Sequence, residues 1–187
     1  MNATGAVAGV PFPANGGCLC LTGLSISKGE WQPANLEKCL DSTLNIVWHE
    51  LKYKAEVVKD YGAIPDCCLP AQLSQVFMNL LVNAGQAIAE RGTITLRTGA
   101  ADGEAWVTIE DTGRGISPAN LKRVFEPFFT TKPIGQGTGL GLSLAYGIIE
   151  RHRGRIEVSS EPDKGTVFRI TLPLERVAYA GAAVPAA

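Results

Sequence analysis

Two asparagines and a glutamine lie about one helical turn apart in the segment 71–90. Its apolar residues recur with helical spacing, whereas Asn79, Asn83 and Gln86 fall on the opposite side. Asparagine costs about 0.5–0.7 kcal/mol relative to alanine inside a helix, so two of them at positions i and i+4 need a reason. Either their amide oxygens bind a metal ion or a ligand, or this helix face is simply solvated. The helix alone leaves both possibilities open.

A carboxylate follows at the end of the strand-like segment 105–111. Residues 110–115 read EDTGRG, so Asp111 precedes two glycines that allow tight turns and close approach of a ligand. A carboxylate at the end of a strand can accept a hydrogen bond from an exocyclic amine. An ordinary Asp/Gly turn would have a similar sequence, and the motif by itself does not decide between the two.

A glycine-rich segment, GQGTGLGL at 135–142, runs directly into the helical pattern of residues 139–152. Four glycines at every second position leave backbone N–H groups unobstructed, and a helix N-terminus adds about half a positive charge. Together these features predict a phosphate cradle. The segment is neither a Walker sequence nor a dinucleotide-binding fingerprint, because no GK[ST] follows and no strand comes immediately before it.

Aromatic residues crowd the segment FEPFFTTK at 125–132. A loop rarely buries the surface of three phenylalanines, so we predict that Phe125, Phe128 and Phe129 pack beneath a flap or form a small satellite core.

Apolar periodicity gives the elements that must position these residues. Helices are predicted from near Pro33 to Leu51, over about 71–90 and over about 139–152, with a short helix after Ser117-Pro118 and a loop at 62–70. Strands are predicted at 55–60, 93–98, 105–111, 155–160 and 166–172, the last four as two antiparallel pairs. This order predicts an α/β two-layer sandwich with a mixed, largely antiparallel sheet and three main helices on one face.

The composition favours one domain, which we assign to residues 31–174. The chain has 187 residues, 45% of them hydrophobic. Residues 1–30 are predicted to be a flexible leader or an expression remnant, and residues 175–187 a disordered tail. The formal net charge of −1 argues against nucleic-acid binding and membrane contact, and no apolar run approaches the roughly 18 residues of a membrane span. The N-terminus is a poor secretory signal, so a cytoplasmic location is expected. The five cysteines are expected to be reduced, with no zinc site.

Taken in order, these segments resemble the catalytic ATP-binding domain of two-component sensor histidine kinases, within the GHKL superfamily. NLLVNAGQAI resembles the N box, DTGRG the first glycine box, FEPFFTTK the F box and GQGTGLGL the second glycine box, and Gly165-Thr166 with Phe168 match the last element. The resemblance covers about residues 31–174 and implies the Bergerat ATP-binding fold. Many members carry lysine or histidine where this chain has Gln86, and an aromatic where it has Ala87, a variation found in the nitrogen-regulation-like subtype.

The resemblance also implies roles for single residues. Asp111 would accept the adenine amino group, with Thr166 nearby; Asn83 would coordinate Mg²⁺ that bridges the ATP phosphates, and Asn79 would support this catalytic end of the site. Residues 130–138 would form the ATP lid, anchored by the three phenylalanines. Lys132 and Arg114 each either contact phosphate or stay solvated. The remaining implied cofactor-binding residues are Gly113, Gly115, Gly137, Thr138, Gly139, Leu140 and Gly141.

The implied activity is that of a protein-histidine kinase whose phosphoacceptor lies outside this chain. The γ-phosphoryl group of ATP would pass to a histidine on a separate dimerisation domain, which would feed a response regulator. His49 and His152 are not expected to be the acceptor, because neither lies in the sequence context of one. Hydrolytic relatives carry glutamate as general base at the position of Asn79, so slow hydrolysis is expected. The alternatives are a hydrolytic ATPase of the same fold and a non-catalytic nucleotide-binding regulatory module.

Overall fold

The computed structural model describes residues 31–64, 67–70, 72–133 and 137–174. The predicted leader and tail lie outside these ranges. The helices are α1 (Leu36–Leu51), α2 (Leu73–Ala87), α3 (Pro118–Leu121) and α4 (Gly141–Arg151). The strands are β1 (Trp31–Ala34), β2 (Ala55–Tyr61), β3 (Cys67–Pro70), β4 (Gly92–Ala101), β5 (Glu104–Asp111), β6 (Arg155–Glu161) and β7 (Gly165–Pro173).

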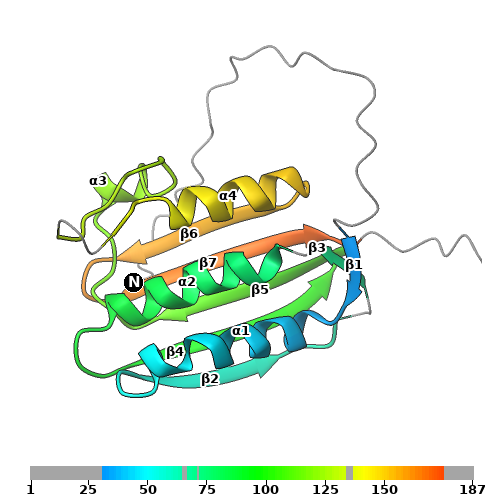
Figure 1. Cartoon of the computed structure of the whole chain (residues 1–187), viewed down its shortest axis with the longest axis horizontal. Helices are drawn as coiled ribbons and strands as arrows, with labels where there is room; N and C mark the ends of the chain where they lie inside the picture. The colour runs from blue at the N-terminus through cyan, green and yellow to red at the C-terminus, as the bar shows by residue number, and fades with distance from the viewer. Residues whose placement is uncertain (1–30, 65–66, 71, 134–136, 175–187) are drawn as a thin grey trace, which may run out of the picture.

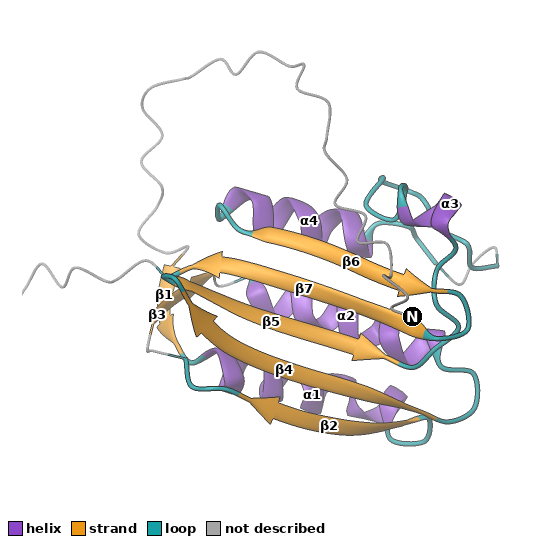
Figure 2. Cartoon of the chain, turned by 180° about the vertical axis from the view of Figure 1, so that it is seen from behind, coloured by secondary structure: helices purple, strands orange, loops and turns teal. Residues whose placement is uncertain are grey.

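Five strands form one sheet, in the order β2-β4-β5-β7-β6. Strand β2 pairs with β4 in parallel, and the three other pairs are antiparallel. Helices α1, α2 and α4 lie on one face of this sheet, and the view from behind shows the sheet in front of them (Figures 1 and 2). The predicted two-layer sandwich, with its mixed and largely antiparallel sheet, is confirmed.

The core fills the space between the helices and the sheet. The predicted stripe of α1 is buried throughout, from Leu36 to Leu51, and Phe77 of α2 is fully buried. From the sheet, alternate residues such as Ile109 and Ile170 point into the same layer. One face of α2 is therefore fixed by apolar packing, and its other face is available for polar side chains.

The start of the first helix differs from the prediction. Residues 31–34 form strand β1, which pairs with β3 within the predicted loop 62–70. Helix α1 begins at Leu36 because Asn35 takes an extended conformation and its side chain accepts a hydrogen bond from the Lys38 N–H at 2.9 Å. The prediction that the helix begins near Pro33 is therefore wrong: Pro33 lies in β1, and α1 begins three residues later, after the Asn35 cap.

Helix α4 also starts later than predicted. Gly139 has φ +67°, a left-handed conformation that cannot continue a right-handed helix, so α4 begins at Gly141. The two antiparallel pairs, β4 with β5 and β6 with β7, are confirmed. Within the described residues, none of the helices combines the length and apolarity required to cross a bilayer.

The Asn35 cap yields a stability prediction. Replacing Asn35 by alanine leaves the N-terminus of α1 without its side-chain acceptor, so we expect Asn35→Ala to lower the free energy of unfolding by about 1 kcal/mol. Urea denaturation measures this change. Asn45→Ala is the matched control, because Asn45 is exposed within α1, where alanine is the better helix former and should be neutral or slightly stabilising. Equal losses in both variants would show that the cap contributes nothing.

Candidate functional site

A cavity of about 700 Å³ opens where the second half of α2, the end of β5 and the start of α4 meet. These parts lie at the same end of the molecule, next to α3 (Figure 1). Most residues predicted from the sequence line this one cavity: Asn79, Asn83, Gln86, Asp111, Arg114, Gly115, Lys132, Gly137, Thr138, Gly139, Gly141 and Thr166. Segments more than 80 residues apart in the sequence thus converge on one site.

Asp111 lies on the cavity wall at the end of β5, with only 4% of its surface exposed. The backbone N–H of Gly113 donates to its Oδ1 at 2.8 Å, and the backbone N–H of Thr166, its partner on β7, also donates to the carboxylate. Burial nevertheless raises the pKa of Asp111 to about 6, an increase to which the nearby Glu110 adds. The result is a buried, oriented hydrogen-bond acceptor on the wall of the cavity.

The glycines around Asp111 make room for backbone rather than for a ligand. A Cβ on Gly113 would lie 2.6 Å from the carbonyl carbon of Ala87, and Gly113 does not line the cavity. Gly115 has φ +67°, and a Cβ there would lie 2.0 Å from the Glu161 carbonyl oxygen. The expectation that Gly113 makes space for a ligand is therefore not supported; its N–H orients Asp111 instead.

Asn79 connects two helices at the cavity. Its Nδ2 donates a hydrogen bond to the carbonyl oxygen of Gly141 at 3.0 Å, so α2 is joined to the first residue of α4. This bond fixes the orientation of the amide, because only the NH₂ end can donate, and leaves Oδ1 as its acceptor. Asn79 therefore positions the N-terminus of α4 against α2.

Lys132 lies against the other two amides of α2. Its Nζ donates to Asn83 Oδ1 at 2.9 Å and also to Gln86 Oε1. Burial, and next the charge of Arg114, lower the pKa of Lys132. The oxygens of two of the amides on this helix face thus converge on one cation, although Gln86 itself is exposed.

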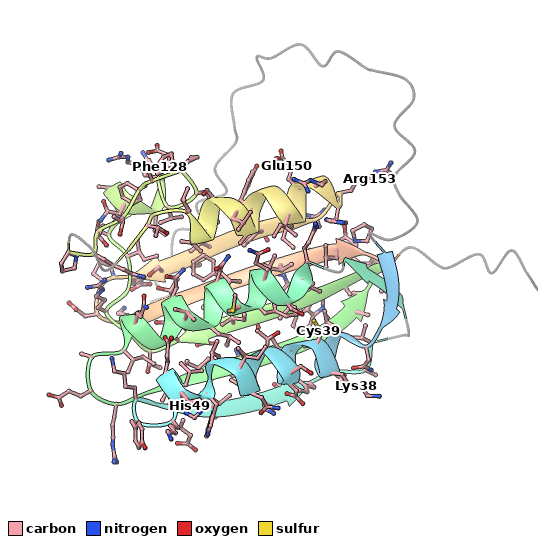
Figure 3. All side chains as sticks on the ribbon, in the orientation of Figure 1. Lys38, Cys39, His49, Phe128, Glu150 and Arg153 are labelled. Carbon is pink, nitrogen blue, oxygen red and sulfur yellow. The ribbon has the colours of Figure 1, made fainter. Side chains whose placement is uncertain are left out.

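The aromatic segment behaves as predicted only in part. The Phe125 ring packs against Tyr146 of α4, with 5.4 Å between centroids, and the Arg123 guanidinium stacks over Phe129 at 4.4 Å. Phe128 is instead 74% exposed and lies on the outside of the molecule (Figure 3). Its φ of +66° turns the side chain outward, so the predicted packing of Phe128 is wrong.

The backbone of Phe128 has a role that its ring lacks. The Phe128 N–H donates to the carbonyl oxygen of Gly139 at 2.9 Å, and a Cβ on Gly139 would lie 2.4 Å from the Phe128 carbonyl carbon. These contacts join the two ends of the segment 129–138, of which residues 134–136 lie outside the described ranges. The predicted lid therefore starts and ends at one point beside the cavity.

The glycine-rich segment leads the N-terminus of α4 to the cavity. Gly137, Thr138, Gly139 and Gly141 line it, whereas Leu140 is 41% exposed and does not contribute to the wall. The positive end of the helix dipole therefore faces the cavity, as a phosphate cradle requires.

Some residues in the cavity wall and behind it were not predicted. Met78 and Val82 lie next to the asparagines on α2 and form an apolar strip of the wall. Their i, i+4 spacing, one residue before each asparagine, could have indicated this position. Ser160 of β6 accepts the N–H of Ile116 at 2.8 Å and donates to the Gly165 carbonyl at 2.7 Å. Its sequence context does not indicate this bridge, because Ile116 lies 44 residues away along the chain.

Comparison with known proteins agrees with this geometry. Residues 68–176 match the family model described as histidine kinase-, DNA gyrase B- and HSP90-like ATPase. Sporulation kinase E of Bacillus subtilis (strain 168) is 47% identical over 113 residues, which cover 60% of this chain and 15% of that kinase. The chain thus spans only a small part of the length of this relative.

Solved structures share the fold. The nucleotide-free catalytic domain of histidine kinase ThkA has a TM-score of 0.68 and 29% identity, covering 78% of this chain and 96% of that one. ThkA in complex with the response regulator protein TrrA has a TM-score of 0.64 and 25% identity, with 78% and 42% covered. Full-length ShkA in complex with AMPPNP has a TM-score of 0.69 and 25% identity, with 76% and 31% covered.

Because the Asp111 carboxylate is buried, we expect its replacement by a neutral amide to increase stability in a pH-dependent way. The pKa of Asp111 is about 6 in the folded protein and 3.8 as an ordinary value. The folded state therefore holds this proton more tightly, and the stability associated with it is present below pH 4 and lost as the pH rises through 6. We expect Asp111→Asn, which is neutral throughout, to raise the free energy of unfolding at pH 7.5 by about 1–3 kcal/mol.

Urea denaturation at pH 7.5 and pH 5 tests this expectation. The gain should shrink at pH 5, where the wild-type carboxyl is largely protonated. Asp102→Asn, at an exposed turn residue, is the control and should change stability by less than about 0.5 kcal/mol at either pH. A loss of stability of equal size at both pH values would contradict the cost assigned to the buried charge.

Proposed function

The chain belongs to the family of histidine kinase-, DNA gyrase B- and HSP90-like ATPases, and we propose that it is the catalytic domain of a sensor histidine kinase. Its cavity would bind Mg²⁺ and ATP, and the γ-phosphoryl group would pass to a histidine on a separate dimerisation and phosphoacceptor domain. The observation that carries this proposal is the pairing, in one cavity, of a buried acceptor at Asp111 with the amide oxygens and helix N-terminus opposite.

Asp111 would select the adenine base. Its carboxylate, oriented by the N–H groups of Gly113 and Thr166, can accept a hydrogen bond from the exocyclic amino group of adenine. Guanine carries a carbonyl oxygen at the corresponding position, which a carboxylate repels. The apolar strip of Met78 and Val82 offers surface for the face of the base.

The opposite end of the cavity would receive the phosphates. The N-terminus of α4 and the N–H groups of the glycine-rich segment suit an oxyanion. Magnesium prefers oxygen ligands and is usually held by one or two protein groups together with substrate phosphates. The amide oxygen of Asn83 fits this requirement, so Asn83 would hold the metal, which neutralises charge on the phosphates when it is bound.

The residues of the chain contribute positioning rather than proton transfer. Asn79 stands where a general base would act on water, but an amide cannot take a proton at neutral pH. Its Nδ2 is engaged by the Gly141 carbonyl, and the bond aligns α4 with α2. Catalysis would therefore depend on holding ATP in line with an incoming imidazole.

The acceptor histidine would be supplied by another domain, and a response regulator would follow it. His49 is exposed on α1 (Figure 3), and His152 is 2% exposed, with Nδ1 2.7 Å from the Ile148 carbonyl oxygen. A buried imidazole at a helix end cannot reach a nucleotide in the cavity. ThkA forms a complex with a response regulator protein, which supports the same partner class here. The nitrogen-regulation-like subtype and a cytoplasmic location, where ATP is abundant, complete the proposal.

Nucleotide binding is the first test. Calorimetric titration with a non-hydrolysable ATP analogue should show saturable binding that Mg²⁺ strengthens, and Asp111→Ala should weaken it by at least about tenfold, as expected for a lost charged hydrogen bond. Asp60→Ala removes an exposed carboxylate on the outer face of the sheet and should leave affinity unchanged. No binding by folded protein would contradict the proposal. Binding without transfer of labelled phosphate to any histidine domain supplied would favour a non-catalytic regulatory module.

Hydrolysis by the isolated chain should be slow. Because Asn79 cannot act as a base, we expect ATP turnover well below about one per second, the low end of ordinary enzymes. A coupled phosphate-release assay measures the rate, and Asn83→Ala serves as the blank for contaminating ATPase. Turnover at or above that rate, lost in Asn83→Ala, would identify the domain as a hydrolytic ATPase instead.

A further inference from the structure

Lys132 contacts helix α2, although the two are far apart in the sequence. Its ammonium donates to both Asn83 Oδ1 and Gln86 Oε1, although 49 and 46 residues separate the partners along the chain. Lys132 is only partly exposed and lines the same cavity as both amides. Ordering a lysine side chain costs rotamer entropy, which two hydrogen bonds to the amides offset here.

The ammonium occupies the coordination position of the oxygen that would hold the metal. A divalent cation bound to Asn83 Oδ1 would lie within a few ångströms of Lys132 Nζ, and two cations at that distance repel strongly in a partly buried site. The same oxygen therefore cannot serve the ammonium in this position and a metal ion at once. Arg114, whose charge already acts on Lys132, makes the surroundings still less favourable for an additional cation.

We propose that Lys132 is an exchangeable counter-cation of the phosphate site: without metal it stays on Asn83 and faces the phosphates in place of the ion, and Mg²⁺ displaces it from this oxygen. This inference rests on the function proposed above. No metal role is assigned to Gln86, so its Oε1 would keep its hydrogen bond to Lys132 while Asn83 exchanges the lysine for the metal. Lys132 thus supplies positive charge to the phosphates when metal is scarce and adds less when metal is present.

This exchange makes a prediction that a simple phosphate contact does not. In Lys132→Met, affinity for ADP in the presence of EDTA should fall about 10- to 100-fold, the size of a lost charged hydrogen bond. With saturating Mg²⁺ the loss of affinity should be about threefold or less. The metal then neutralises the phosphates, and in Lys132→Met it has no ammonium to displace from Asn83. The ratio of the two dissociation constants, measured by calorimetry, is therefore the readout.

Lys122→Met is the matched control. Lys122 is exposed beside α3 and does not line the cavity, so the variant changes net charge equally without touching the site. It should leave both dissociation constants unchanged. Circular dichroism on each variant confirms that the proteins compared are folded.

Two further measurements separate exchange from a structural role. In the nucleotide-free protein, the side-chain amide NMR signals of Asn83 and Gln86 should shift in Lys132→Met and not in Lys122→Met. The double variant Gln86→Lys with Lys132→Met places an ammonium on α2 itself, and it should recover most of the metal-free affinity lost in Lys132→Met.

The outcomes distinguish this inference from the function on which it rests. If the wild-type chain binds no nucleotide, the proposed function fails. If it binds, but Lys132→Met weakens binding equally with and without Mg²⁺, or has no effect in EDTA, the exchange is overturned while the nucleotide site stands. Failure of the double variant to recover affinity would equally count against a role for positive charge at this point.

Discussion

Backbone N–H groups of Gly113 and Thr166 hold the buried Asp111 carboxylate, and the chain around it is packed to place them. A Cβ on Gly165 would lie 1.9 Å from the Asp111 carbonyl oxygen, so β7 can approach β5 this closely only with glycine at that point. Gly113 and Gly115 meet α2 and β6 in the same way. Burying a carboxylate without such donors is costly, and the two donors come from two segments, the loop after β5 and the start of β7, which must close together. The end of β5, the loop that follows it and the end of α2 therefore pack as one unit around Asp111.

Helix α2 connects this unit to the start of α4. One of its faces is locked into the core by residues such as Phe77, so its polar face cannot rotate. Asn79 on that face holds the start of α4, and Asn83 meets Lys132. Side chains on a packed helix are placed more precisely than side chains on loops. The spacing between Asp111 and the start of α4 is thus set by hydrophobic packing.

Much of this arrangement could be predicted from the sequence, because it follows from local periodicity. The sheet and the three main helices come from apolar spacing, and the polar face of α2 from two asparagines four residues apart. The exceptions depend on contacts between distant segments. Phe128 turns outward because its backbone pairs with Gly139, Gly113 fits against Ala87, and β1 requires β3 as a partner. No pattern within a single segment contains that information.

Gln86 shows how a departure from a family pattern can be compensated elsewhere. Where the resemblance leads one to expect lysine or histidine, the glutamine side chain accepts a hydrogen bond from Lys132, so a cation reaches nearly the same place from another segment. The two solutions differ physically. A cation on α2 would be fixed to the core, whereas Lys132 belongs to the segment whose ends are joined by the Phe128–Gly139 hydrogen bond. Placing the charge on residue 132 rather than on α2 therefore ties Asn83 to the segment that carries Lys132, a connection that a lysine on α2 would not provide.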